Sequence, residues 1–283
     1  MRTPVLAFAA AWLCGALFPA ATSAEPLDPR LREIWYDPQA VVTVPVKRGI
    51  VTDIVLDVGE AITDVASGLG GDCAKPDASW TGSSGHLHMS LWDAAKDVPL
   101  MFEADAAKAG PYGLSEVGQH FVAGMMKLSR ELAVFIAPFI NSYKRYASLS
   151  WAPVNVVWGR DNRTTGFRLV GRGPGLHVED RFPGGDMNAY LTYAAMMGAG
   201  LYGIEHELPL DPEFKGNGYL ATGVERMPRA LYEAIWELER SEAAVEIFGQ
   251  DVVDHYLNAA RVEQDTYDSM VHPWDRERYL ERG

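Results

Sequence analysis

The sequence predicts an α+β fold, in which a sheet of short strands is combined with separate helices. Three apolar segments, residues 154–158, 166–170 and 176–182, are separated by charged and turn-forming residues, which is typical of short strands. Apolar residues recur every three or four positions in residues 116–137, which indicates a helix. With 283 residues, 48% of them hydrophobic and 22% charged, the chain is long and apolar enough to bury a sizeable core.

The charge and the cysteine content exclude several classes of function. The formal net charge of -13 argues against nucleic acid and anionic membrane surfaces as partners. Cys14 and Cys73 are the only cysteines, and they are too few and too far apart for a metal-binding framework.

The first 24 residues have the layout of a secretory signal peptide. Arg2 precedes an apolar run over residues 5–17, and small residues suited to cleavage follow at positions 22–24. The run is too short to span a membrane, so we expect no spanning segment after its removal. A buried N-terminal helix is the alternative. The signal-peptide interpretation implies a periplasmic or secreted protein.

Residues 25–80 predict a small β domain. Apolar and polar residues alternate over positions 41–46 and 50–58, and residues 47–49 read Lys-Arg-Gly, a turn between two strands. The segment resembles the N-terminal part of the periplasmic core-complex subunit of type IV secretion systems, in the conjugal-transfer family. The matching pieces are YDP at 36–38, VPVKRGIVTDIVLDVGEAI at 44–62 and LGGDCAKPDASW at 69–80. A generic small β module is the alternative.

Residues 81–283 predict the main α+β domain. Residues 85–92 alternate with period two, so His86, His88 and Ser90 share one face of a strand. Ser115 is a suitable N-cap for the helix over residues 116–137, which Pro138 ends. Further helices are expected over residues 186–204, 228–240 and 251–267, and Pro273 interrupts a charged, solvated tail.

Arginines gather in residues 141–188 although the whole chain is acidic. The guanidinium group offers a fixed fork of donors to a carboxylate or a phosphate, so this window indicates a site for anions. The predicted strands would hold these cations on a rigid sheet. The six arginines of the window are Arg145, Arg160, Arg163, Arg168, Arg172 and Arg181.

The same window resembles the glutamine synthetase family. The matching pieces, in order, are NSYKR, then AP followed by a strand and W-G-x-x-NR, a Glu-x-Arg pair, and N-x-Y-L at the start of a helix. With the GSSGHLHMSLW stretch, the resemblance covers about residues 82–283, the C-terminal part of the family's catalytic domain. It implies an antiparallel sheet with packed helices, a homo-oligomer, a cytoplasmic location and a role in glutamine biosynthesis.

The resemblance implies an ATP-dependent ligase that joins glutamate to ammonia or an organic amine through γ-glutamyl phosphate, with Mg²⁺ or Mn²⁺ as cofactor. It assigns a metal ligand to His86 and to Glu179, and ATP contacts to His88, Ser90, Arg163 and Arg168. It assigns glutamate binding to Arg145 and Arg181, and catalytic roles to Arg168 and Arg181. Without the family context, the histidines are a hydrogen-bonded surface pair and Glu179–Arg181 is a surface ion pair. Arg160 and Arg172 match no family position, and we expect them to be solvated.

One residue departs from the pattern of the ammonia-using members. The position just before Ala-Pro is a flap glutamate there, which takes the ammonium proton, and here it is Trp151. An indole is not a base, but it can line a pocket for an organic amine. Simple core packing of Trp151 is the alternative.

The two resemblances meet between residues 80 and 81 without a linker, whereas natural fusions join complete domains through exposed linkers. We therefore hypothesise that the reading frame is chimeric. The family's other metal carboxylates come from an earlier half, and no Glu-x-Glu precedes His86. We expect the chain to be inactive alone. The competing function is a periplasmic structural subunit whose C-terminal part is passenger sequence.

Overall fold

The computed structural model describes residues 82–93, 95–96, 98–147 and 150–280. The predicted signal peptide, the predicted β domain and the expected boundary after residue 80 lie outside the described residues. The described part of the chain corresponds to the predicted α+β domain.

Four short strands form the main sheet, in the order β1-β6-β5-β4. They are β1 (Leu87–Met89), β4 (Trp158–Arg160), β5 (Phe167–Val170) and β6 (His177–Asp180). Strand β6 runs antiparallel to both β1 and β5, but β4 runs parallel to β5. The expectation of an antiparallel sheet is therefore wrong for the β4–β5 pair. Asp161 takes a left-handed φ of 48° just after β4, where the chain turns back toward the start of β5.

Two of the three predicted strands of the arginine window are confirmed, and the first one is shifted. Residues 166–170 and 176–182 contain β5 and β6, whereas β4 begins at Trp158, where the first strand was expected to end. Residues 154–157 are extended but pair elsewhere. Val156 N donates to Glu225 O at 2.8 Å, and Met227 N donates to Val154 O at 3.0 Å. A further two-stranded sheet pairs β2 (Trp92–Asp93) with β3 (Val98–Pro99).

The helix expected over residues 116–137 is broken in the structure. It consists of α1 (Glu116–Leu128) and α2 (Ala133–Ile136), and α3 (Ile140–Tyr143) comes after Pro138. Ser115 caps α1 as predicted, since its side chain accepts from Gly118 N. The break lies at Ser129, whose hydroxyl donates to Met125 O at 2.7 Å. A serine hydroxyl that donates to the carbonyl four residues earlier competes with the backbone N–H that normally bonds to that carbonyl, and this bends or ends a helix.

The C-terminal half of the domain is helical, and the expected helices are present. They are α4 (Ala189–Glu205), α5 (Leu231–Glu239) and α7 (Gln250–Asp268). The sequence did not predict α6 (Glu242–Phe248), although Ser241 caps it by accepting from Ala244 N. Pro273 does not interrupt the tail as expected but begins α8 (Pro273–Tyr279), because a proline fits the first turn of a helix.

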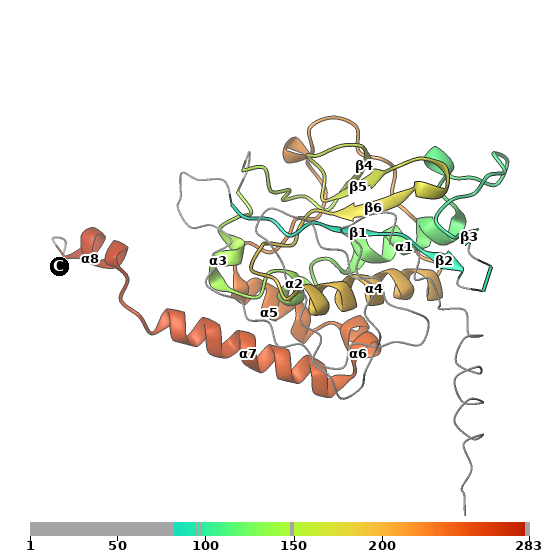
Figure 1. Ribbon diagram of the computed structural model, residues 1–283. Helices are drawn as coiled ribbons and strands as arrows, with labels where there is room; N and C mark the ends of the chain where they lie inside the picture. The colour runs from blue at the N-terminus through green and yellow to red at the C-terminus, as the bar shows by residue number, and fades with distance from the viewer. Residues whose placement is uncertain (1–81, 94, 97, 148–149, 281–283) are drawn as a thin grey trace, which may run out of the picture. The chain divides into compact units, whose positions relative to one another are not determined.

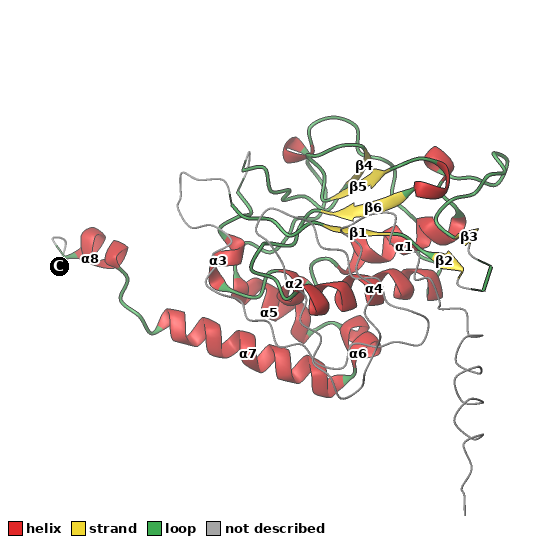
Figure 2. Ribbon diagram, in the orientation of Figure 1, coloured by secondary structure: helices red, strands yellow, loops and turns green. Residues whose placement is uncertain are grey.

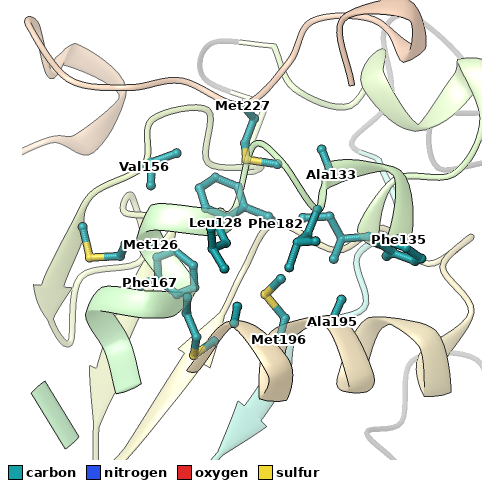
Figure 3. Close-up of a cluster of buried hydrophobic side chains, with 14 of the residues drawn as sticks. Met126, Leu128, Ala133, Phe135, Val156, Phe167, Phe182, Ala195, Met196 and Met227 are labelled. Carbon is teal, nitrogen blue, oxygen red and sulfur yellow. The ribbon is translucent and has the colours of Figure 1, made fainter. Parts of the chain in front are cut away.

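The long helices lie on one side of the main sheet, with α1 and α4 next to it and α5 to α7 farther away (Figures 1 and 2). Leu87 and Met89 of β1 and Phe167 of β5 are buried, and they join the helices in one hydrophobic core. Figure 3 shows part of this core, where Phe167 and Phe182 meet Met126 and Met196. None of the described helices is long and apolar enough to cross a membrane. The other face of the sheet is left for polar side chains.

Candidate active site

Strand β6 places Glu179 in the middle of the polar face of the sheet. The register aligns Glu179 with His88 of β1 on one side and with Arg168 of β5 on the other. Directly opposed residues of neighbouring strands project to the same face. Residues two apart on one strand do so too, which adds Arg181 to this face. The sheet register therefore brings an acid and several cations to one spot.

Glu179 is contacted by three of the residues predicted for the site. Its Oε1 lies 2.8 Å from an Nη of Arg181 and 3.1 Å from His86 Nδ1, and its Oε2 accepts from an Nη of Arg168 at 2.9 Å. His88 Nε2 is 3.8 Å from the same carboxylate. Glu179 and Arg181 are 3% and 5% exposed, so the interpretation as a surface ion pair is wrong. Both predicted metal ligands meet here with His88, Arg168 and Arg181, while their individual roles stay predictions.

The cations hold Glu179 in its charged form. Burial raises the pKa of Glu179, but hydrogen bonds from His86 and Arg168 and the charge of Arg181 outweigh burial and keep the pKa well below its ordinary value. The exposed Asp161 also binds Arg168, accepting from Nε at 2.9 Å and from an Nη. Arg168 is thus fixed between two carboxylates, and one guanidinium edge is tied to each.

Arg145 lies behind this group, in the interior. It is 2% exposed, and its Nη2 donates to the carbonyl of Phe182. Burial lowers the pKa of Arg145, while Tyr146, Asp186 and Asp180 raise it. The described structure therefore does not bring Arg145 into contact with Glu179. Arg145 and Arg181 still interact electrostatically, since the charge of Arg181 lowers the pKa of Arg145.

Arg163 and Ser90 lie at the margins of the site. Arg163 is exposed and lines an open cleft of about 420 Å³ at the end of β4. The other residues that line this cleft are Arg160, Asp161, Asn162, Glu213, Phe214, Lys215 and Gly216. Ser90 is exposed, and its hydroxyl accepts from Trp92 Nε1 at 3.1 Å. The cleft carries three cations and two carboxylates, so its lining has a small excess of positive charge and contains donors for an anion.

For single residues, one expectation is corrected, one is confirmed and one alternative is excluded. Arg160 is not solvated: it is half-buried and donates to the carbonyls of Leu169, at 3.2 Å, and of Gly171. A long side chain at the end of a strand can donate hydrogen bonds to backbone carbonyls that have no partner in the short neighbouring strand. Arg172 is exposed, as expected. Trp151 is 73% exposed, so its packing in the core is excluded.

Trp151 has an unusual backbone and a neighbour that links it to the site. Its φ of 68° lies in the left-handed region, which is rare for a bulky residue and is often found at functional sites. The half-buried Tyr219 forms a hydrogen bond with the Trp151 backbone. Burial raises the pKa of Tyr219, and Arg181 and Arg145 oppose that rise. The backbone of Trp151 is thus linked through Tyr219 to the neighbourhood of the two predicted substrate arginines.

Sequence reasoning missed residues that the structure adds to the site. His177 Nε2 lies 3.2 Å from His88 Nδ1, with ring centroids 5.3 Å apart. The signal was available, since His177 stands two residues before Glu179 and must share its face. Asp161, which binds Arg168, was missed because it shows no pattern of its own, and the buried Asp180 behind the site was missed for the same reason. Asp180 points into the core, where burial raises its pKa to about 7.

The residues predicted to bind a divalent cation form only part of a metal site. His86 and Glu179 are adjacent, but both oxygens of Glu179 already take hydrogen bonds from arginines. The described residues contain no group of three or more His, Cys, Asp or Glu placed to hold a metal ion. Mg²⁺ prefers several oxygen ligands in octahedral geometry. This arrangement therefore does not fit a metal by itself.

Comparison with known proteins places this chain in a family. The profile of the family described as glutamine synthetase, catalytic domain, matches residues 61–279. The chain is 44% identical over 201 residues to γ-glutamylethanolamide synthetase GlnA4 of Streptomyces coelicolor, covering 71% of this chain and 42% of that protein. It is 45% identical over 212 residues to glutamate–isopropylamine ligase of a Pseudomonas species, covering 74% and 45%.

A solved structure agrees with the sequence relatives. The ligand-free form of GmaS has a TM-score of 0.66 and 29% identity, over 75% of this chain and 48% of that one. The chain spans less than half the length of these relatives. The profile match starts at residue 61, ahead of the expected boundary after residue 80, which stays a prediction. Since the profile matches most of the chain, and the sheet brings His86, Glu179, Arg168 and Arg181 together, this chain belongs to the glutamine synthetase family through its catalytic domain.

Proposed function

We propose that the chain carries the site of an ATP-dependent ligase that joins the γ-carboxylate of glutamate to an organic amine. The observation that carries the proposal is the convergence of His86, Arg168 and Arg181 on Glu179, next to a cleft with further cations. Such a surface suits two anions, the triphosphate of ATP and the carboxylates of glutamate.

The reaction has two steps. A γ-carboxylate oxygen of glutamate attacks the γ-phosphorus of ATP, the bond from that phosphorus to the bridging oxygen breaks, and ADP leaves. The amine nitrogen then attacks the acyl carbon of γ-glutamyl phosphate, inorganic phosphate leaves, and the nitrogen loses a proton. In this scheme Arg168, fixed by Asp161 and Glu179, binds phosphate oxygens, and Arg181 stabilises the charge that develops during transfer.

Divalent cations of the Mg²⁺ or Mn²⁺ type would neutralise phosphate charge in this chemistry. His86 and Glu179 are the residues we propose for such an ion. These two residues alone do not complete a site, so the steps above rest on the side chains of this chain.

Trp151 favours an organic amine over ammonia. Its indole is exposed and offers an apolar surface, and it cannot take a proton from ammonium. Two of the relatives are named for γ-glutamylethanolamide and isopropylamine, which supports the same substrate class.

Calorimetry on the full chain tests the site. We expect saturable binding of ATP and of glutamate, and Arg168→Gln should weaken ATP binding at least tenfold. Arg172→Gln is the matched control, because Arg172 is exposed and outside the site. Absence of ATP binding to the wild-type chain, or equal losses in the two variants, would refute the proposed function.

We further propose that the chain does not turn over by itself. In the described structure the carboxylate of Glu179 is hydrogen-bonded to Arg168, Arg181 and His86, and the described residues contain no complete set of metal ligands. A γ-glutamyl hydroxamate assay with Mg²⁺ or Mn²⁺ should stay at background. Hydroxamate formation that depends on ATP and on Arg181 would show that the chain is active alone.

A further inference from the structure

Arg145 carries a charge in an environment that does not solvate it. The side chain is 2% exposed, and its Nε is buried without a hydrogen-bond partner among the described residues. A buried guanidinium is costly unless nearby charge and hydrogen bonds compensate it. What surrounds Arg145 therefore decides how rigidly it is held.

Two acidic side chains, both nearly inaccessible, act on this charge. Asp180 of β6 is 0% exposed and Asp186, in the loop before α4, is 4% exposed. Both raise the pKa of Arg145, and Asp186 does so more strongly than Asp180. They act on Arg145 through the electric field inside the protein, whereas Nη2 of the guanidinium donates to the Phe182 carbonyl and the centroid of the Tyr146 ring lies 5.1 Å from the guanidinium carbon.

Asp186 also holds the helix that leads into Arg145. Ser142 Oγ, in α3, donates to Asp186 Oδ2 at 2.7 Å, and Phe139 N donates to the same hydroxyl at 3.0 Å. Arg145 lies two residues after the end of α3. Asp186 Oδ1 is buried with no hydrogen-bond partner among the described residues. One carboxylate thus hydrogen-bonds to α3 and acts electrostatically on the arginine just beyond this helix.

We propose that Asp186 is a positioning residue for Arg145: it ties α3 through Ser142 and neutralises the buried guanidinium, which holds Arg145 in place for the glutamate carboxylate. The last part rests on the proposed function. Asp180 does not tie α3, since its Oδ1 accepts from Phe182 N, two residues along the chain, at 3.0 Å.

Calorimetry on the full chain separates this role from a general structural one. Asp186→Asn keeps the size of the side chain and an acceptor for Ser142 but removes the charge. We expect glutamate affinity to fall at least tenfold while ATP affinity stays within twofold. Ser142→Ala should give a smaller loss in the same direction. Glu246→Gln, at an exposed ion pair with His206, is the control and should change neither affinity.

Equal losses for glutamate and ATP would indicate a merely structural role and overturn the proposal, as would an unchanged glutamate affinity. A double-mutant cycle on the free energy of unfolding, with Asp186→Asn and Arg145→Met, needs no ligand. Coupling should appear as non-additivity, because Asp186→Asn harms the fold less once the guanidinium is gone. If the wild-type chain binds no glutamate, the proposed function fails, and the double-mutant cycle alone tests whether Asp186 acts on Arg145. Additive effects of the two substitutions on the free energy of unfolding would then reject the positioning role.

Discussion

At the scale of single residues, Glu179 is the side chain on which the polar face depends. It is almost inaccessible to solvent, yet it stays charged because His86, Arg168 and Arg181 surround it. Removing one partner of such a buried group leaves the others without compensation. Substitution of Glu179 is therefore expected to lower the free energy of unfolding as well as to impair function.

We predict that Glu179→Gln lowers the free energy of unfolding at pH 7 by about 3 kcal/mol, since it leaves two buried or half-buried arginines without their shared carboxylate. The pKa of Glu179 is depressed in the folded state, so its stabilisation is present above the ordinary value of 4.5 and is lost as the pH falls below it. Urea denaturation of both proteins at pH 7 and pH 3.5 measures this. A difference that is as large at pH 3.5 as at pH 7 would contradict the assignment.

Asp180 gives the opposite pH dependence. Burial raises its pKa from 3.8 to about 7, so the folded protein binds a proton that the unfolded chain has already released. The contribution of this group to stability is greatest below pH 3.8, and it falls by up to about 1.4 kcal/mol per pH unit as the pH rises toward 7. Asp180→Asn should remove this slope, which urea titrations at several pH values resolve. Parallel stability curves for wild type and variant would show that Asp180 titrates normally.

At the scale of elements, α1 and α4 approach each other through glycines. A Cβ added at Gly124 of α1 would lie 2.1 Å from the Ala199 carbonyl oxygen and 2.7 Å from the Gly203 Cα of α4. These neighbours are backbone atoms, which do not move aside as a flexible side chain does. The close contact between α1 and α4 therefore requires glycine at position 124.

We predict that Gly124→Ala lowers the free energy of unfolding by about 1–3 kcal/mol, as overpacking in a dense core does. Gly175→Ala is the matched control, since a Cβ there meets nothing within 4 Å. Its effect should stay within about 0.5 kcal/mol. Thermal or urea denaturation compares the two, and equal effects of both substitutions would mean that the helix contact is not tight.

Also at this scale, the sequence predicted the helices better than their interruptions. Apolar periodicity continues from α1 into α2, so it could not show that Ser129 ends the first helix by bonding to Met125 O. Likewise, residues 154–157 pair with residues 225–227, a segment far along the chain. Local patterns do not contain such long-range choices of partner.

At the scale of the whole molecule, the N-terminal segment raises the question of location. Residues 1–24 predict export, whereas the proposed ligase needs ATP. We propose that residues 1–24 are a signal peptide that exports the protein. We also keep the hypothesis that the reading frame is chimeric, with two unrelated sequences joined after residue 80. A periplasmic structural subunit remains the competing function.

We predict that the C-terminally tagged full chain, expressed in bacteria, appears in the periplasmic fraction and starts after residue 24. Cell fractionation and N-terminal mass analysis measure this. A variant with charged residues in the apolar run, Leu13→Asp with Leu17→Asp, is the control and should stay in the cytoplasm. Cytoplasmic wild-type chain with its first residues intact would contradict the signal peptide.

The sequence by itself determined which residues face together along one strand: the period of two put His86 with His88, and Glu179 with Arg181, because side-chain direction in a strand is a local property. Only the tertiary structure decided that Arg168 neutralises Glu179 from a neighbouring strand, that Asp180 and Asp186 lie in the interior, and that Arg145 is buried among them. Burial and ion pairing depend on register and packing between segments far apart in the chain. The same holds for the state of each charge, since solvent exclusion and neighbouring charges, not residue type, set it.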